Sequence, residues 1–293
     1  MNTRSERGIL FDVQRFCLHD GPGIRTTVFF KGCPLNCAWC HNPESKSPLP
    51  ELSFHRESCI GCGECKKACT HENCVHCFAC AGACPSGART KIGYESTVDE
   101  VIATALRDRP FYGQDGGVTI SGGEPFMQPA FLLAVLEAAK EHGLHTAIET
   151  SGAAKESDLL AAAAYTDLFL FDIKGIPGET HRQYVGCDGQ SLHDNLRLLD
   201  AHGAKSVLRC PIVPGVQDNA AHFAYLARLA KELRHVTEID IEPYHTAGLA
   251  KAKDLGRTDV FTVENYDKAA FRGKIEREFL PLLADVGVPV SLY

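Results

Sequence analysis

The chain has 293 residues, 44% hydrophobic and 23% charged, which is ordinary for a globular protein of one large domain or two average ones. Its net charge of −7 argues against a nucleic-acid partner, because such proteins usually carry a basic surface. No apolar run approaches the roughly 18 residues that cross a bilayer, and residues 1–7 lack the apolar core of a signal peptide. We therefore expect a cytoplasmic protein that does not contact the membrane.

Six short runs of β-branched, aromatic or aliphatic residues predict strands, in chain order at 26–30, 118–121, 146–149, 168–172, 207–213 and 239–241. Near-continuous apolar runs of this kind suit a parallel sheet that is buried on both faces. Apolar residues with helical spacing lie between the runs, at 98–106 and 132–139. The alternation predicts an α/β fold, a partial (β/α)6 barrel, with its functional site at the carboxyl ends of the strands.

Eleven of the fourteen cysteines lie between Cys33 and Cys84. Because disulfides are rare in the cytosol, this crowding indicates metal clusters. Cys33, Cys37 and Cys40 form a C-x3-C-x2-C triplet just after the first predicted strand. Three thiolates this close can hold three irons of a [4Fe-4S] cube and leave the fourth iron open to a substrate or cofactor. A structural zinc site is the alternative, although zinc needs a fourth ligand.

Residues 55–90 show little helix or strand periodicity and carry two tandem C-x2-C-x2-C-x3-C runs, made by Cys59, Cys62, Cys65 and Cys69 and then by Cys74, Cys77, Cys80 and Cys84. Each run is typical of bacterial ferredoxins, in which three cysteines bind one [4Fe-4S] cluster and the fourth binds the other. Thr70 replaces the usual proline, and only four residues separate the runs. We predict a ferredoxin-like domain at 55–90 inserted into a barrel of 1–54 and 91–293, with tandem zinc knuckles as the alternative.

A second motif, Asp20-Gly-Pro-Gly-Ile-Arg25-Thr26, precedes the triplet, and Trp39 stands before its last cysteine. The combination resembles the radical S-adenosylmethionine (SAM) superfamily and, within it, the activating enzymes of glycyl radical enzymes, relatives of pyruvate formate-lyase activase. The resemblance implies that the open iron binds SAM and that a 5′-deoxyadenosyl radical removes a hydrogen from a glycine of a partner glycyl radical enzyme. It also implies a ferredoxin or flavodoxin as reductant. It assigns Asp20 and Arg25 to contact with the glycine peptide and Trp39 to the adenine.

Polar residues follow the next predicted strands. Gly122-Gly123-Glu124 comes after 118–121. Glycines at a strand end allow a ligand to approach the backbone, and Glu124 can accept from an ammonium group. The resemblance implies that this loop holds the methionine amino group of SAM. Glu149 and Thr150 match a family segment that binds SAM and a nearby monovalent cation, although Glu149 stands where the family has aspartate.

The later strands carry further predicted SAM contacts. Asp172 and Lys174 match an Asp-x-Lys segment of the family, in which the lysine pairs with the SAM carboxylate. Arg209, on the next strand, and His245 are expected to face SAM. Glu242 stands where the family has leucine, before Pro-Tyr-His.

Two other functions remain open at this stage. One is a radical SAM enzyme that acts on a small molecule or on another kind of protein, against which the Asp20–Thr26 motif argues. The other is a ferredoxin-type electron carrier with a barrel attached, which would have no open iron. The sequence does not identify the partner glycyl radical enzyme.

Overall fold

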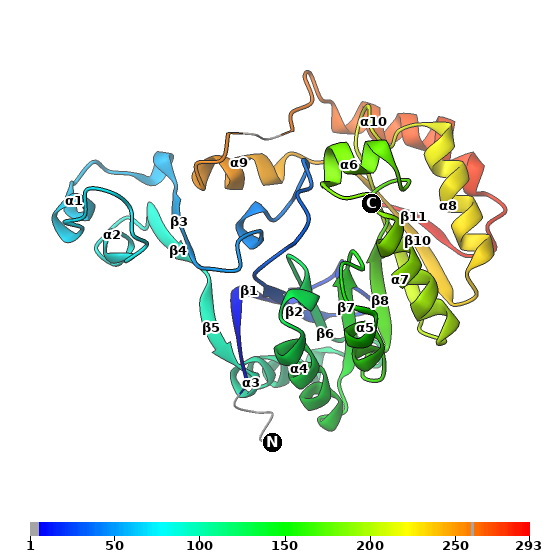
Figure 1. The fold of residues 1–293 in the computed structure, drawn as a ribbon, viewed down its shortest axis with the longest axis horizontal. Coiled ribbons are helices and arrows are strands. Elements are labelled where there is room, and N and C mark those ends of the chain that lie inside the picture. Colours follow the sequence, from blue (N-terminus) through cyan, green and yellow to red (C-terminus); the bar gives the residue numbers. More distant parts are fainter. Residues whose placement is uncertain (1–5, 259–260) are drawn as a thin grey trace.

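The computed structural model describes residues 6–258 and 261–293. In this part of the chain the main sheet has nine strands in the order β11-β10-β9-β8-β7-β6-β2-β1-β5 (Figure 1). The strands are β1 (Arg7–Cys17), β2 (Arg25–Phe30), β5 (Tyr94–Thr97), β6 (Gly117–Gly122), β7 (His145–Thr150), β8 (Leu168–Asp172), β9 (Ser206–Ile212), β10 (Val236–Pro243) and β11 (Val290–Leu292).

The strands from β2 and β6 through β11 are parallel, whereas β1 pairs antiparallel with both β2 and β5. Helices cover the outside of the curved sheet (Figure 1). They are α3 (Val98–Asp108), α4 (Pro129–Glu141), α5 (Glu156–Ala163), α7 (Gln190–Ala201), α8 (Ala220–Glu232) and α10 (Lys268–Lys274), whereas α6 (Glu179–Val185) and α9 (Ala247–Asp254) lie beside the loop that follows β2. The predicted α/β partial barrel is confirmed, and its six predicted strands are β2 and β6–β10.

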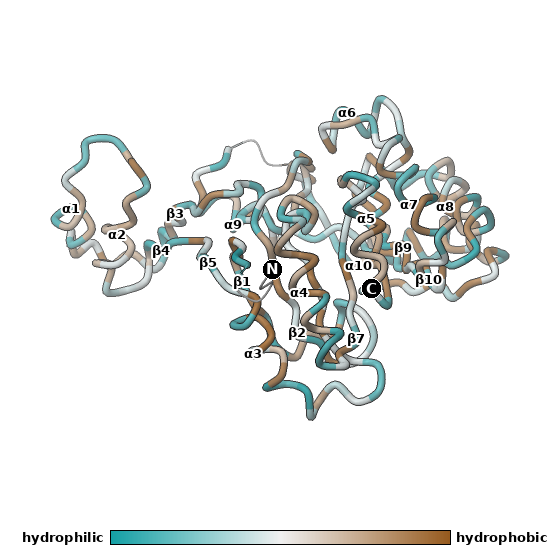
Figure 2. The backbone as a smooth tube through the Cα atoms, turned by 60° about the horizontal axis from the view of Figure 1, so that its bottom comes forward, coloured by the Kyte–Doolittle hydropathy of each residue, from teal (hydrophilic) through white to brown (hydrophobic). Residues whose placement is uncertain are grey.

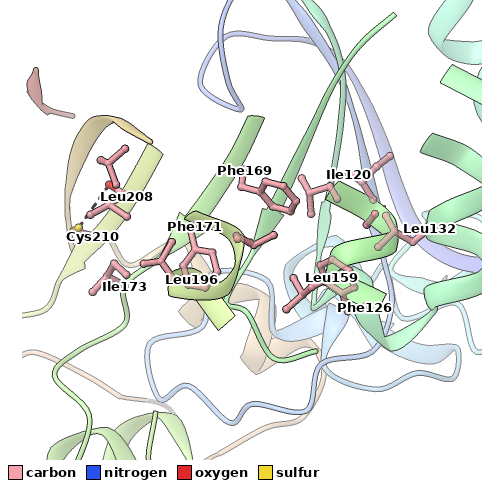
Figure 3. Close-up of a cluster of buried hydrophobic side chains, with 14 of the residues drawn as sticks. Ile120, Phe126, Leu132, Leu159, Phe169, Phe171, Ile173, Leu196, Leu208 and Cys210 are labelled. Carbon is pink, nitrogen blue, oxygen red and sulfur yellow. Dashed lines mark hydrogen bonds between the residues drawn. The ribbon is translucent and has the colours of Figure 1, made fainter. Parts of the chain in front are cut away.

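The core lies between the sheet and these helices. Phe169 and Phe171 of β8 are fully buried, and helical side chains such as Leu132 of α4 and Leu196 of α7 pack in the same cluster (Figure 3). Burying each such side chain stabilises the fold by about 1.5–3 kcal/mol. The apolar residues from which the strands and helices were predicted are therefore the ones that pack the helices against the sheet.

The sequence analysis did not predict strand β1. Most of its residues are partly or fully exposed, and Phe11 and Val13 alternate with Asp12 and Gln14. Such a half-polar pattern contrasts with β2, whose six residues are all buried. Short edge strands such as β5 and β11 carry too few residues for periodicity to reveal them.

The cysteine-rich segment forms an arm beside the barrel. Strands β3 (Glu51–Phe54) and β4 (Arg89–Ile92) pair antiparallel as its stem, and the short helices α1 (Glu64–Ala68) and α2 (Ala79–Gly82) lie beyond them. Figures 1 and 2 show this arm set apart from the barrel in two directions. Glu51 anchors the stem through Arg257, 3.1 Å away.

Every one of residues 55–87, all of which the structure describes, is at least partly exposed. The arm thus has no hydrophobic core of its own. Separately, a search of the described helices finds none both long and apolar enough to cross a membrane.

Candidate functional site

The loop that follows β2 carries the cysteine triplet and forms one wall of a cavity of about 140 Å³. The opposite wall consists of residues at the carboxyl ends of β6, β7, β8, β9 and β10, where the barrel was expected to place its site. Ten of the predicted site residues line this cavity: Cys33, Cys37, Cys40, Trp39, Gly122, Gly123, Glu149, Thr150, Asp172 and Lys174.

The three cysteines are well shielded from solvent. Burial raises the pKa of Cys33 to about 12 and that of Cys37 to about 11. Among the described residues, no three His, Cys, Asp or Glu side chains are arranged to hold a single metal ion. In an iron–sulfur cube each thiolate binds its own iron, so the sulfurs need not converge on one point.

Gly122 and Gly123 are required by the close packing of two loops. A Cβ on Gly122, whose φ is +121°, would lie 2.2 Å from the Phe30 carbonyl oxygen, and one on Gly123 would lie 2.3 Å from that of Gly32. The backbone N–H of Gly123 donates to Phe30. The glycines thus bring the end of β6 against the base of the cysteine loop.

Glu124 does not line the cavity, which corrects the predicted contact with the SAM amino group. Its side chain is 0% exposed. One carboxylate oxygen accepts from the Thr150 hydroxyl at 2.7 Å, and the other accepts from the hydroxyl and backbone N–H of Ser151 at 2.6 and 3.0 Å. Glu124 therefore holds the end of β7 in place, and the carboxylate has no free side to offer a ligand.

Lys174 reaches the cavity from the loop after β8 and pairs with Asp172, whose Oδ2 lies 2.9 Å from Nζ. Burial alone would lower the pKa of Lys174, but the charge of Asp172 and the nearby cysteines more than offset this, and the net pKa is raised. Lys174 is therefore a permanent cation beside the cysteine triplet, able to bind a carboxylate.

Arg209 of β9 lies between two carboxylates. Its Nη1 donates to Glu149 at 2.7 Å, and its Nε donates to Glu242 at 2.6 Å. The other oxygen of Glu149 accepts from the Ser121 hydroxyl. Burial raises the pKa of Glu149 to about 7, and Arg209 opposes the shift. Arg209 contacts the cavity wall through these partners rather than lining it.

Comparison with known proteins identifies the family. A model of the radical SAM superfamily matches residues 65–227. The isethionate sulfite-lyase activating enzyme of Nitratidesulfovibrio vulgaris is 41% identical over 87% of this chain and 89% of its own length. The benzylsuccinate synthase activating enzyme of Thauera aromatica is 37% identical over 89% of this chain and 85% of its own. The chain belongs to the radical SAM superfamily.

Within the superfamily, the chain is an activating enzyme of the glycyl radical enzyme group, as these relatives show. The crystal structure of Streptococcus suis SuiB shares the fold alone, with a TM-score of 0.56, 13% identity and coverage of 90% of this chain and 47% of that one. The family match begins after the cysteine triplet, so the role of the triplet rests on its spacing and on the cavity it lines.

In this activating enzyme, His245 lies beside the cavity rather than in it, stacked on His41 with ring centroids 3.7 Å apart. Burial first, and then the neighbouring His245, lowers the pKa of His41 to about 3, which keeps its imidazole neutral. His41 lines the cavity directly, but sequence reasoning had missed it. Its position immediately after Cys40 was the available signal.

Arg25 lies far from the triplet. It pairs with Gly117 at the start of β2 and β6, whereas the cysteine loop leaves the other end of the strand, about 16 Å away for five residue steps. Arg25 is 0% exposed, and its guanidinium donates to the Thr119 hydroxyl and to backbone carbonyls that include Pro22 and Val118. The predicted direct contact of Arg25 with a peptide is therefore wrong, because its donors are already used inside the protein.

Asp20 lies at the same end of the barrel, in the loop that Arg25 holds. Its Oδ2 accepts from the Thr27 hydroxyl at 2.7 Å, and its carbonyl accepts from Thr119 at 2.6 Å. Asp20 is partly exposed, so a contact with a partner peptide stays a prediction.

Proposed function

We propose that this activating enzyme installs a radical on one backbone glycine of a partner enzyme, using the cavity beside the cysteine triplet as its reaction site. The observation that carries the proposal is the meeting of three cysteines, the Gly122-Gly123 turn and the Lys174 cation around one cavity. The donor set fits the implied groups: three thiols for a [4Fe-4S] cluster, a buried cation for the SAM carboxylate, and an open backbone for its amino group.

Each of the chain's own residues has a defined part in this site. Cys33, Cys37 and Cys40 would hold three irons, and Lys174 would bind the carboxylate of SAM. Trp39, at 6% exposure, would support the adenine and exclude water. When bound, the cluster and SAM supply the 5′-deoxyadenosyl radical that removes the glycine hydrogen. The barrel then keeps solvent away from the reacting atoms.

The proposed site does not include a monovalent cation. The carboxylate oxygens of Glu149 are taken by Arg209 and Ser121, and Asp172 is paired with Lys174. These residues do not fit a cation site, because the guanidinium of Arg209 already neutralises Glu149 and the ammonium group of Lys174 already neutralises Asp172. No step is assigned to a cation.

We also propose that the cysteine-rich arm holds two further [4Fe-4S] clusters that pass electrons from a ferredoxin or flavodoxin. Support comes from the lack of any buried residue at 55–87, because so small a segment needs a metal or clusters to order it. Ile60 and Val75, next to cysteines of the two runs, are 68% and 57% exposed and would suit docking of a small electron carrier.

The experiment is anaerobic reconstitution with iron and sulfide, followed by SAM, reduced flavodoxin and a candidate partner. A glycyl doublet in the EPR spectrum is the expected result. The first partner to test is an isethionate sulfite-lyase, since two relatives with 41% and 40% identity activate that enzyme by name. If no glycyl radical enzyme is activated while a small molecule stimulates SAM cleavage, the small-molecule alternative replaces this proposal.

A further inference from the structure

The stem of the cysteine-rich arm meets the cysteine loop at one carboxylate. Glu51 is the first residue of β3, and its Oε2 accepts from Nζ of Lys31 at 3.2 Å. Lys31 follows β2 directly, stands two residues before Cys33 and is 0% exposed. The other oxygen of Glu51 accepts from Nη2 of Arg257 at 3.1 Å. One side chain of the arm thus binds two cations, one at the root of the cysteine loop and one after α9.

Arg257 and α9 both lie against the triplet. Arg257 lines a small cavity of about 40 Å³ together with Cys37 and Cys40. The backbone of α9 packs on the same loop, since a Cβ on Gly248 would lie 2.2 Å from the carbonyl oxygen of Cys40. Figures 1 and 2 show α9 beside the stem strand β3. The cation that Glu51 binds after α9 is therefore held at the back of the cysteine triplet.

The far end of the stem lies beside a cysteine of the arm. Phe54 pairs with Arg89, and the backbone N–H of Arg89 donates to Sγ of Cys84 at 3.4 Å. Three residue steps separate Glu51 from Phe54 along β3, a length of about 10 Å. By the ferredoxin rule, Cys84 is the fourth cysteine of its run and binds the cluster of the other run. The stem therefore runs from the root of the cysteine loop to a ligand of one proposed arm cluster.

Among the described residues, ion pairs join the arm to the rest of the chain at two places, and the one at Glu51 is better shielded. The other joins His55 to Asp254 at 2.7 Å, but the His55 side chain is 51% exposed, and exposed pairs contribute little. The Lys31 side chain is 0% exposed, so losing its carboxylate partner is costly. Residues 55–87 include no buried side chain that could fix the arm by packing. Glu51 is therefore the polar contact on which the placement of the arm depends.

We propose that Glu51 is a positioning residue for electron transfer: through Lys31 and Arg257 it holds the arm at a fixed distance from the cysteine triplet. This inference rests on the proposed function, because it requires clusters in the arm and at the triplet. One electron leaves the reduced flavodoxin and reaches the triplet by way of the arm, and no atom changes place. Since the rate of electron transfer falls steeply with distance, a displaced stem slows reduction at the triplet while the SAM site itself stays intact.

The test compares two reductants on cluster-loaded enzyme with SAM. Reduced flavodoxin delivers electrons by docking on the protein, whereas titanium(III) citrate is a small reductant that needs no docking surface. We expect Glu51→Gln to slow flavodoxin-driven SAM cleavage roughly tenfold or more and titanium-driven cleavage less than about twofold. Arg257→Met should slow the flavodoxin-driven reaction in the same selective way. Because both changes act through one contact, the double variant should be little slower than Glu51→Gln alone.

Glu57→Gln, which removes the same charge from an exposed position of the arm, is the matched control and should react like the unchanged enzyme. An unchanged flavodoxin-driven rate in Glu51→Gln, or an equal loss with both reductants, would overturn the inference, and so would additive losses in the double variant. If Glu51→Gln does not fold or loses iron, Arg257→Met provides the same comparison, because its side chain is partly exposed. If the unchanged enzyme holds only about four irons, the proposed function of the arm fails first, so the two failures are distinguishable.

Discussion

Lys174 offers the sharpest test of the site, because it is a buried cation with one carboxylate partner and a cavity on its other side. Lys174→Met keeps most of the aliphatic volume and removes the charge. A hydrogen bond to a charged group is worth about 1.5–3 kcal/mol. At 1.4 kcal/mol for each factor of ten, losing this contact should weaken SAM binding by about 10- to 150-fold.

The same substitution also leaves Asp172 as an uncompensated charge, and breaking a buried pair costs about 3–5 kcal/mol of folding stability. The double variant Lys174→Met/Asp172→Asn separates the two effects, because it removes both charges. Its melting temperature should return toward that of the unchanged protein, while its SAM affinity should stay low.

SAM affinity is measured under anaerobic conditions by calorimetry and by the change in the EPR spectrum of the reduced cluster. Lys205→Met, at an exposed position, is the control for loss of a lysine charge. A SAM affinity within threefold of the unchanged enzyme in Lys174→Met would remove Lys174 from the site and refute the reasoning.

Three other features give direct tests. Glu124→Gln should lower the melting temperature, because its amide nitrogen must face either the Ser151 donors or the Thr150 hydroxyl, and both orientations lose a hydrogen bond to a charged acceptor at a cost of about 1–3 kcal/mol; an unchanged melting temperature with weaker SAM binding would restore the direct contact. Arg25→Ala should cost about 3 kcal/mol or more by denaturant unfolding, since it leaves several buried carbonyls unpaired, and Arg25→Lys should recover part of this. Iron analysis should give about twelve atoms per chain, and alanine at the three cysteines of the triplet should leave about two-thirds of them; a value near four would exclude clusters in the arm.

The sequence predicted the strands whose residues are apolar on both faces and the site residues that follow them. In a parallel barrel all carboxyl ends of strands meet at one rim, so Thr150, Asp172 and Lys174 could be placed together without knowing any distance. Strand β1 was not predicted because its residues are half polar, a pattern that does not distinguish a strand from a loop.

Side-chain direction was not predictable in the same way. Glu124 follows the Gly-Gly turn, but whether it faces the cavity or the protein depends on Thr150 and Ser151, which are about 26 residues later in the chain. Arg25 likewise lies close to the cysteine triplet in sequence, yet a six-residue strand separates them in space. Closeness in the sequence to a site motif therefore predicted more direct ligand contacts than the structure supports.

Two departures from the family pattern, Glu149 for aspartate and Glu242 for leucine, have a common cause in the structure. Both carboxylates bind the guanidinium of Arg209: Glu242 lies on the adjacent strand β10, and Glu149 lies on β7, two strands away in the sheet. The longer side chain at position 149 lets its carboxylate meet Arg209 and Ser121 at once, and Glu242 supplies the second anion. An arginine held by two anions is charged at every physiological pH and has little freedom to move. A permanent positive charge is thus held directly behind the cavity wall by Glu149 and Glu242, which themselves line the cavity.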